Sequence, residues 1–319
     1  MAATVRFAVV GWAPKGSHVA IAGSHPKLGS WSPDGGPRME CTIGDQRWDS
    51  EPDYWWTEAE IPARECAALE YKFAYKAPGA HEWTWDQGGN RKFTETAPRA
   101  GEKVLLNVEK FSDGVSSEHD HTGRFYNSVR ERNEMHCRKV TDQIYLGSCP
   151  RRKEHIIQKM KEMGITCVMN FQTEADCMKN CVAGIGMEED ALAVRELYVE
   201  AGIEYIWLPT FDMSTAGRTA MLPHASQTMM SLLKRKHVVY VHCNAGVGRS
   251  TGAVCGYLMY CLGLSAREMM HTVARARTVA FFDFAALDAA KPRYEAMFGS
   301  PDKGLEEQKN ALLKSTSIA

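Results

Sequence analysis

The feature that most constrains the fold is an apolar run that ends in a histidine and a cysteine and leads into a glycine-containing loop. The run HVVYVH at 237–242 has the β-branched and aromatic character of a buried strand. CNAGVGR follows at 243–249, and an apolar segment of helical length begins at Ser250. A strand that passes through a tight loop into a helix is the basic unit of α/β proteins, which bind ligands at the carboxyl ends of their strands.

Strands and helices alternate over the last two thirds of the chain. Strand-like apolar runs occupy 142–148, 165–171 and 203–209, and helix-like segments occupy 150–164, 188–202 and 221–236, with a further helix from Ser250 onward. This alternation predicts an α/β domain with a mostly parallel central sheet flanked by helices on both faces.

The first third of the chain has a different texture. It holds all but one of the 8 tryptophans, and only Trp207 follows. Alternating, β-branched runs occupy 5–12, 18–23, 54–61, 69–76 and 103–109, and Gly, Pro, Asn and Asp separate them. This pattern predicts a small all-β antiparallel sandwich.

The change in composition and hydrophobic pattern sets the predicted domain boundaries. A chain of 319 residues is long enough for two domains. We expect the sandwich at 1–112, a polar linker at 113–137, the α/β domain at 138–300 and a C-terminal tail at 301–319.

Composition argues against several classes of partner. The formal net charge is −1 and no long Lys/Arg run occurs, so nothing favours nucleic acid. The longest nearly apolar stretch, 252–266, is shorter than a membrane span requires. The N-terminal apolar run is too short for a signal peptide, so we expect a cytoplasmic protein.

The loop after the cysteine has the composition of a phosphate cradle. Glycines in a tight loop let successive backbone N–H groups form an anion-binding nest. The residues that would form this nest are Asn244, Ala245, Gly246, Val247 and Gly248. Arg249 adds a planar fork for two phosphate oxygens.

The cysteine inside this loop is a candidate nucleophile. The helix N-terminus, the amides and the guanidinium all favour the thiolate form of Cys243, which would face the bound phosphate. Ser250 can hydrogen-bond the sulfur and stabilise it as a leaving group, and His242 would order the loop. The alternative is a buried cysteine beside a loop that only turns the chain, but the complete HCNAGVGRS segment favours a phosphate site.

These residues resemble the HCxxGxxR[ST] signature of the cysteine-dependent protein tyrosine phosphatases. The resemblance implies that an aspartate in the loop after an earlier strand protonates the leaving oxygen, and Asp212 has this place. Asp212 could instead be a helix cap or turn residue. Asp176 and Asp283 are weaker candidates, since neither follows an apolar strand so directly. No metal or cofactor is expected, because Arg249 and the amides supply the positive charge.

Three motifs in the first third resemble the family 20 carbohydrate-binding module, the starch-binding domain. They are GxxxxLGxW at 23–31, YKF at 71–73 and WxWDxGxNR at 83–91. The resemblance implies a glucan site made of Trp31, Lys72, Trp85 and Asn90. Aromatic faces stack on sugar rings, and polar neighbours bind the hydroxyls. The other tryptophans could be core residues.

A carbohydrate-binding module followed by a dual-specificity phosphatase domain resembles the glycogen phosphatases. The resemblance implies hydrolysis of phosphate monoesters on glycogen or a related α-glucan, association with glycogen, partners among glycogen-metabolism proteins, and is compatible with a homodimer. Two alternatives stay open: a glycogen-anchored dual-specificity protein phosphatase, which would use the same catalytic residues, and a glycogen-bound scaffold. Intact Cys243, Arg249 and Asp212 argue against an inactive scaffold.

Overall fold

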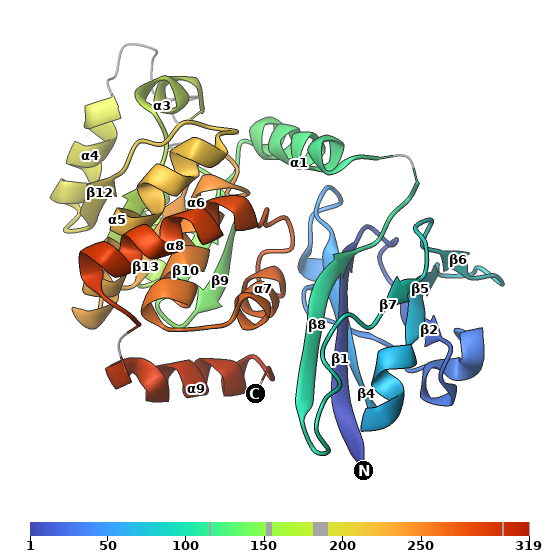
Figure 1. The fold of residues 1–319 in the computed structure, drawn as a ribbon. Coiled ribbons are helices and arrows are strands. Elements are labelled where there is room, and N and C mark those ends of the chain that lie inside the picture. The colour runs from blue at the N-terminus through green and yellow to red at the C-terminus, as the bar shows by residue number, and fades with distance from the viewer. Residues whose placement is uncertain (115, 151–154, 181–190, 302, 319) are drawn as a thin grey trace. The chain divides into compact units, whose positions relative to one another are not determined.

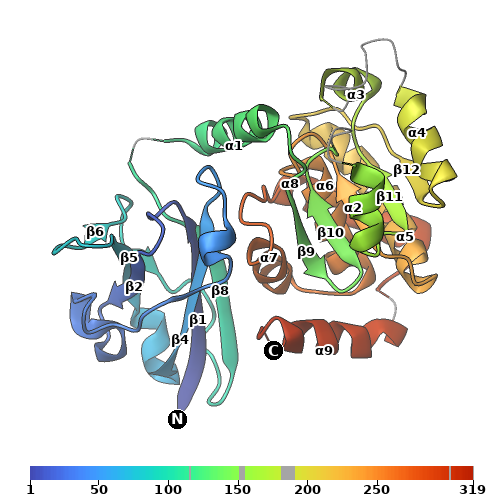
Figure 2. The same ribbon diagram turned by 180° about the vertical axis from the view of Figure 1, so that it is seen from behind.

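The chain divides into two compact units. The computed structural model describes residues 1–114, 116–150, 155–180, 191–301 and 303–318. The N-terminal unit comprises Met1–His121 with Met270–Thr278 and Ile318, and the C-terminal unit comprises Thr122–Met269 with Val279–Ser317. Both are drawn in Figure 1 and, from behind, in Figure 2.

Two sheets make up the N-terminal unit. One has the strand order β3 (Glu40–Cys41), β4 (Asp53–Pro62), β1 (Ala2–Gly11) and β8 (Lys103–Lys110). The other has β2 (His18–Gly23), β5 (Glu70–Lys76) and β6 (Thr84–Trp85), with β7 (Arg91–Lys92) also paired to β5. All five predicted strand runs are confirmed. The β1–β8 pair is parallel, unlike the antiparallel sandwich expected, because the chain reaches β8 from the other sheet and not through a hairpin.

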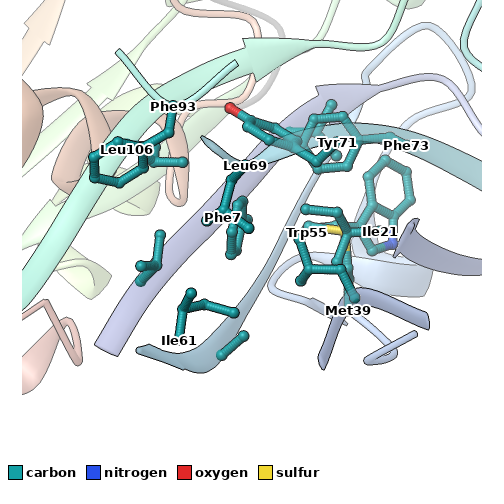
Figure 3. Packing of buried hydrophobic residues seen from close by; sticks show 14 of the residues in the cluster. Phe7, Ile21, Met39, Trp55, Ile61, Leu69, Tyr71, Phe73, Phe93 and Leu106 are labelled. Atoms are coloured by element: carbon teal, nitrogen blue, oxygen red, sulfur yellow. The ribbon is translucent and has the colours of Figure 1, made fainter. Parts of the chain in front are cut away.

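The core of this unit lies between the inner faces of the two sheets. Alternate residues of β1 and β5, among them Phe7, Tyr71 and Phe73, belong to one buried apolar cluster. Figure 3 shows these rings packed with Trp55 and Ile21. Trp55 is therefore a core residue, whereas Trp31 keeps 37% of its surface exposed.

The C-terminal unit has one sheet with the strand order β12 (Glu204–Trp207), β11 (Cys167–Asn170), β13 (Val239–His242), β10 (Ile144–Gly147) and β9 (Cys137–Thr141). Only β9 pairs antiparallel within this order. On one face lie α5 (Thr215–Lys234), α6 (Arg249–Gly256) and α8 (Phe284–Phe298), as Figure 1 shows, and on the other lies α2 (Ile156–Glu162), visible in Figure 2. The predicted α/β fold is confirmed.

The remaining helices are α1 (Glu118–Arg132), α3 (Glu174–Asn180), α4 (Ala191–Glu200), α7 (Ala266–Ala274) and α9 (Glu306–Ser315). A π-helical turn, Tyr257–Cys261, extends α6. Across the described ranges, no helix combines the length and apolar character that a membrane crossing needs.

Some helix boundaries differ from the sequence expectation. The segment expected as a linker contains α1. Its sequence is mostly polar, and among its described side chains only Phe125 and Val129 are buried, so the helical period is weak in the sequence. The expected tail contains α9. Helix α5 starts six residues before the predicted position, since Ser214 Oγ accepts a hydrogen bond from Gly217 N at 2.9 Å and caps it. Of the predicted helices 150–164 and 188–202, residues 151–154 and 188–190 lie outside the described residues.

The core assignment predicts a large loss of stability for Phe73→Ala. Phe73 is fully buried, and its ring centroid lies 5.8 Å from that of Tyr71. Removing a buried phenyl ring costs about 3–5 kcal/mol of unfolding free energy. Urea unfolding followed by circular dichroism checks this, with Phe73→Leu as the milder control. A cost below about 1 kcal/mol for the alanine variant would contradict the assignment.

Candidate active site

Cys243 lies directly after the central strand of the C-terminal sheet. Strand β13 ends at His242 between β11 and β10, and α6 begins at Arg249. The Cys243 side chain is buried, with 3% of the residue exposed. Ser250 Oγ donates a hydrogen bond to Cys243 Sγ at 3.3 Å, as the sequence predicted. The strand–loop–helix unit therefore places a thiol at the N-terminus of a buried helix.

Three carbonyls of the loop are held by groups outside it. Cys149 N donates to Asn244 O at 3.0 Å, and Phe281 N donates to Val247 O at 2.9 Å. Thr251 Oγ1 donates to Gly246 O at 3.4 Å. Gly246 has φ +70°, a conformation that favours glycine. Fixing the carbonyls outward orients the peptide units of the loop, which is what an anion-binding nest requires.

Arg249 is fully buried and joins the ends of two further strands. Its Nη1 donates to Phe171 O at 3.3 Å and Thr210 O at 2.9 Å, beyond β11 and β12, and lies 2.6 Å from Asp176 Oδ2. Nη2 lies 2.9 Å from Asp212 Oδ2, an ion pair without hydrogen-bond geometry. Nε and Nη2 are buried and have no hydrogen-bond partner among the described residues. This edge of the guanidinium can donate to two oxygens of one phosphate.

Charges around Arg249 hold it protonated. Burial lowers the pKa of Arg249, but Cys243, Asp212 and Asp176 outweigh burial and raise that pKa above its ordinary value. Burial raises the pKa of Asp176, but hydrogen bonds from Asn244 and Arg249 and the charge of Arg249 bring it below the ordinary value. The pair therefore stays ionised at neutral pH.

The Asn244 side chain cross-links the site. Its Nδ2 donates to Asp176 Oδ1 at 2.8 Å and to Asp212 Oδ2 at 3.2 Å. Its Oδ1 accepts from Gln172 Nε2 at 2.7 Å and from Asn180 Nδ2 at 3.2 Å. Asn244 is predicted as part of the phosphate cradle, and its side chain also positions both carboxylates.

The three candidate aspartates occupy different places. Asp212 lies beside Arg249, and its side chain is 48% exposed. Asp176 reaches the same guanidinium from α3, where Thr173 and Asp176 hydrogen-bond each other in a capping arrangement. Asp283 instead caps α8 through Ala286 N. Thr173 to Asp176 form a TxxD pattern directly after the strand β11, and this pattern is the sequence signal by which Asp176 could have been recognised.

His242 is buried next to the cysteine. Its Nδ1 lies 3.3 Å from Cys243 O, and its ring stacks on Tyr240. Burial, opposed by the hydrogen bond to the Cys243 carbonyl and aided by the charge of Arg249, lowers the pKa of His242 to about 4. His242 is therefore neutral at pH 7, which fits loop ordering and not proton transfer.

The predicted sugar-binding side chains of β5 and β6, Lys72 and Trp85, lie on the sheet face that points away from the core. Ala74 is the register partner of Trp85, and Lys72, two residues before Ala74, faces the same side. Tyr71 and Phe73 face the core. The half-buried side chains of Trp85 and Lys72 thus share one face of this sheet.

Trp31 ends a short helical segment, Pro26–Trp31, after β2. The buried Leu28 anchors this segment, and Trp31 has φ +70°. Such a conformation is uncommon for a tryptophan and persists only where the surroundings fix it. The loop therefore holds the backbone of Trp31 in a defined conformation and leaves its side chain partly exposed.

Polar residues of the WxWDxGxNR motif have structural partners. Asn90 Nδ2 donates to Glu70 Oε2 at 3.3 Å. Asp86 is fully buried, pairs with Arg91 and accepts a hydrogen bond from Ser112 N at 2.7 Å. The Asp86–Arg91 pair thus orders the motif from inside.

Family models match both halves of the chain. "Starch binding domain" matches residues 2–104, and "Dual specificity phosphatase, catalytic domain" matches residues 144–285. Laforin of Mus musculus is 36% identical over 314 residues, which cover 88% of this chain and 91% of laforin. The chain belongs to the laforin family. It is a cysteine-dependent phosphatase with a starch-binding domain, as the sequence motifs predicted.

Two further relatives match less than half of the chain. The chloroplastic phosphoglucan phosphatase LSF1 of Arabidopsis thaliana is 32% identical over 126 residues, 39% of this chain and 20% of that protein. Glucoamylase-1 of Arthroderma benhamiae is 33% identical over 90 residues, 28% of this chain and 13% of that enzyme.

The neutral state of His242 predicts an acid-sensitive fold. The folded-state pKa of about 4 lies below the ordinary value of 6.5, so the unfolded state binds more protons between these values. The contribution of neutral His242 to the unfolding free energy is fully present above pH 6.5 and is lost as the pH falls toward 4. His242→Asn should reduce the loss of unfolding free energy between pH 7 and pH 5 by about 2 kcal/mol. Urea unfolding of wild type and His242→Asn at both pH values checks this, and an equal loss of unfolding free energy in the two proteins would contradict it.

Proposed function

We propose that this protein binds glycogen or a related α-glucan through its starch-binding domain and hydrolyses phosphate monoesters of that polymer through a phosphocysteine intermediate. The observation that supports this most is the meeting of Cys243, Arg249 and Asp212 in a chain of the laforin family. The laforin and LSF1 relatives, one of them named a phosphoglucan phosphatase, point to the same substrate class.

In the first step, the Cys243 thiolate attacks the phosphorus of the substrate. The loop amides and the Nε–Nη2 edge of Arg249 hold the phosphate oxygens. The S–P bond forms while the bond from phosphorus to the glucose oxygen breaks. Protonated Asp212 gives its proton to that oxygen, since a sugar alkoxide is a poor leaving group.

In the second step, water hydrolyses the phosphocysteine. The Asp212 carboxylate takes a proton from the attacking water, a new P–O bond forms, and the S–P bond breaks. Inorganic phosphate leaves and the thiolate returns. Ser250 Oγ, 3.3 Å from the sulfur, stabilises the departing thiolate by its hydrogen bond.

The starch-binding domain raises the local substrate concentration. Trp31, Lys72 and Trp85 would contact glucose units, with Asn90 beside them, so that the tethered phosphatase unit meets phosphate groups on the same polymer. In this proposal, residues 1–112 form the glucan-binding domain and residues 138–300 form the phosphatase domain. A cytoplasmic, glycogen-associated location, partners in glycogen metabolism and a homodimer remain predictions of the same proposal.

The proposal predicts a split between two substrates. We would measure phosphate release from phosphorylated amylopectin and glycogen and from an aryl phosphate, with wild type, Cys243→Ser and Trp31→Ala/Lys72→Ala. Cys243→Ser should lose both activities, because it removes the nucleophile. The double variant should lose glucan activity about tenfold or more and keep aryl activity, because losing stacking and a sugar-contacting cation weakens only polymer binding.

Wild type that cleaves the aryl phosphate but ignores both glucans would contradict the proposal. Such a result would favour the glycogen-anchored protein phosphatase.

The acid role predicts a dependence on the leaving group for Asp212→Asn. Loss of a general acid costs about 10²–10⁴-fold in rate where the leaving group needs a proton. Glucan phosphate should show this loss in kcat, whereas p-nitrophenyl phosphate, whose phenolate leaves well, should lose much less. Equal losses on both substrates would assign Asp212 to phosphate binding instead.

A further inference from the structure

A second buried ion pair lies outside the residues that would touch substrate. Arg218 Nε donates to Asp283 Oδ2 at 2.7 Å, and Nη2 lies 2.6 Å from the same oxygen. Only 7% of the Arg218 side chain and 8% of the Asp283 side chain are exposed. Removing two charges from water costs about as much free energy as their attraction returns, so such a pair adds little net stability. Its role is better judged from the elements that it contacts.

Arg218 packs against the outer side of the phosphate loop. A Cβ added to Gly248 would lie 3.6 Å from Arg218 Nη1, and one added to Gly252 would lie 3.8 Å from Arg218 Cδ. The guanidinium also lies over the ring of Phe281, 5.4 Å from its centroid. Phe281 N is the donor that holds Val247 O at 2.9 Å. The pair thus backs the half of the loop that precedes Arg249.

The same arginine belongs to the helix that starts beside Asp212. Arg218 N donates to Ser214 O at 3.0 Å in the first turn of α5, and Ser214 follows Asp212 by two residues. On the other side, Asp283 Oδ1 accepts a hydrogen bond from Ala286 N at 3.1 Å and caps α8. One ion pair therefore links the acid loop, the phosphate loop and the start of α8.

We propose that Arg218 and Asp283 are positioning residues: their ion pair fixes Val247 and Gly248 relative to Asp212, so that the loop amides and Arg249 close on an oxyanion together. The proposal rests on the phosphatase chemistry of the loop and not on the glucan substrate. It gives Asp283 a part in the reaction through Arg218 and not as the acid.

Asp283 keeps its charge in the folded protein. Burial raises the pKa of Asp283, but the Ala286 N–H and Arg218 outweigh burial and lower that pKa below its ordinary value. A neutral replacement of one partner leaves the other charge buried and unpaired, which is strongly destabilising. A single variant that fails to fold would say nothing about positioning, so the decisive variant must remove both charges.

The decisive variant is Arg218→Met/Asp283→Asn. Asn at 283 keeps a good helix cap, and removal of both buried charges is expected to be nearly neutral for stability. We would measure inhibition by vanadate, an oxyanion that binds where phosphate binds, and KM and kcat for p-nitrophenyl phosphate. The expected result is a wild-type unfolding midpoint with the Ki for vanadate and the KM raised about tenfold.

Two further variants separate positioning from general stability. Tyr260→Phe removes a hydrogen bond of 2.6 Å to Leu287 O in α8 and should lower the unfolding midpoint without changing the Ki. Arg218→Lys keeps the charge but loses the fork and should give an intermediate Ki.

Wild-type Ki and KM in the double variant would overturn the proposal. An equal rise of Ki in Tyr260→Phe would also overturn it, since loosening of α8 would then suffice. Neither readout uses a glucan, so failure of the glucan proposal would appear separately, as wild type that binds vanadate and cleaves aryl phosphate but releases no phosphate from amylopectin.

Discussion

The buried guanidinium of Arg249 is the constraint on which the site depends. A charge removed from water needs partners, and Arg249 finds them beyond the ends of two neighbouring strands, at Phe171 O and Thr210 O, and at Asp176. These partners can meet only because β11 lies between β12 and β13 in the sheet. The strand order thus decides which loops reach the arginine, and the catalytic loop is one of three segments that converge on it.

Local features of the site could be predicted from the sequence because they lie on consecutive residues. The loop from Cys243 to Arg249 and the Ser250 contact follow from a strand, a tight turn and a helix start. The Asn244–Asp176 and Asn244–Gln172 contacts could not be predicted this way, since they join residues about seventy positions apart and depend on which strands are neighbours. Helix α1 was missed for a related reason: two buried apolar residues are too few to give its polar sequence a visible period.

The outer face of β5 shows the same division between local pattern and tertiary contact. Period-two alternation on β5 sends Tyr71 and Phe73 inward, so Lys72 must face outward, and its side of the sheet follows from sequence alone. The partner of Asp86, by contrast, cannot be predicted from the sequence alone. A carboxylate inside a sugar-binding motif suggests a ligand contact, yet Asp86 is fully buried against Arg91. Burial of a motif residue is a property of the whole fold.

The contrast between two carboxylates on one guanidinium favours a division of roles. Asp176 is tied by Thr173, Asn244 and Arg249, which stabilise its charged form and account for its lowered pKa. Asp212 is half exposed and is held by Arg249, Asn244 and its neighbouring Met213 N. A phosphate dianion arriving beside both carboxylates repels them, and the one that can move or take up a proton relieves that repulsion. Asp212 is the freer of the two, which favours it as the proton donor, while Asp176 serves as the fixed counter-charge that keeps Arg249 in place.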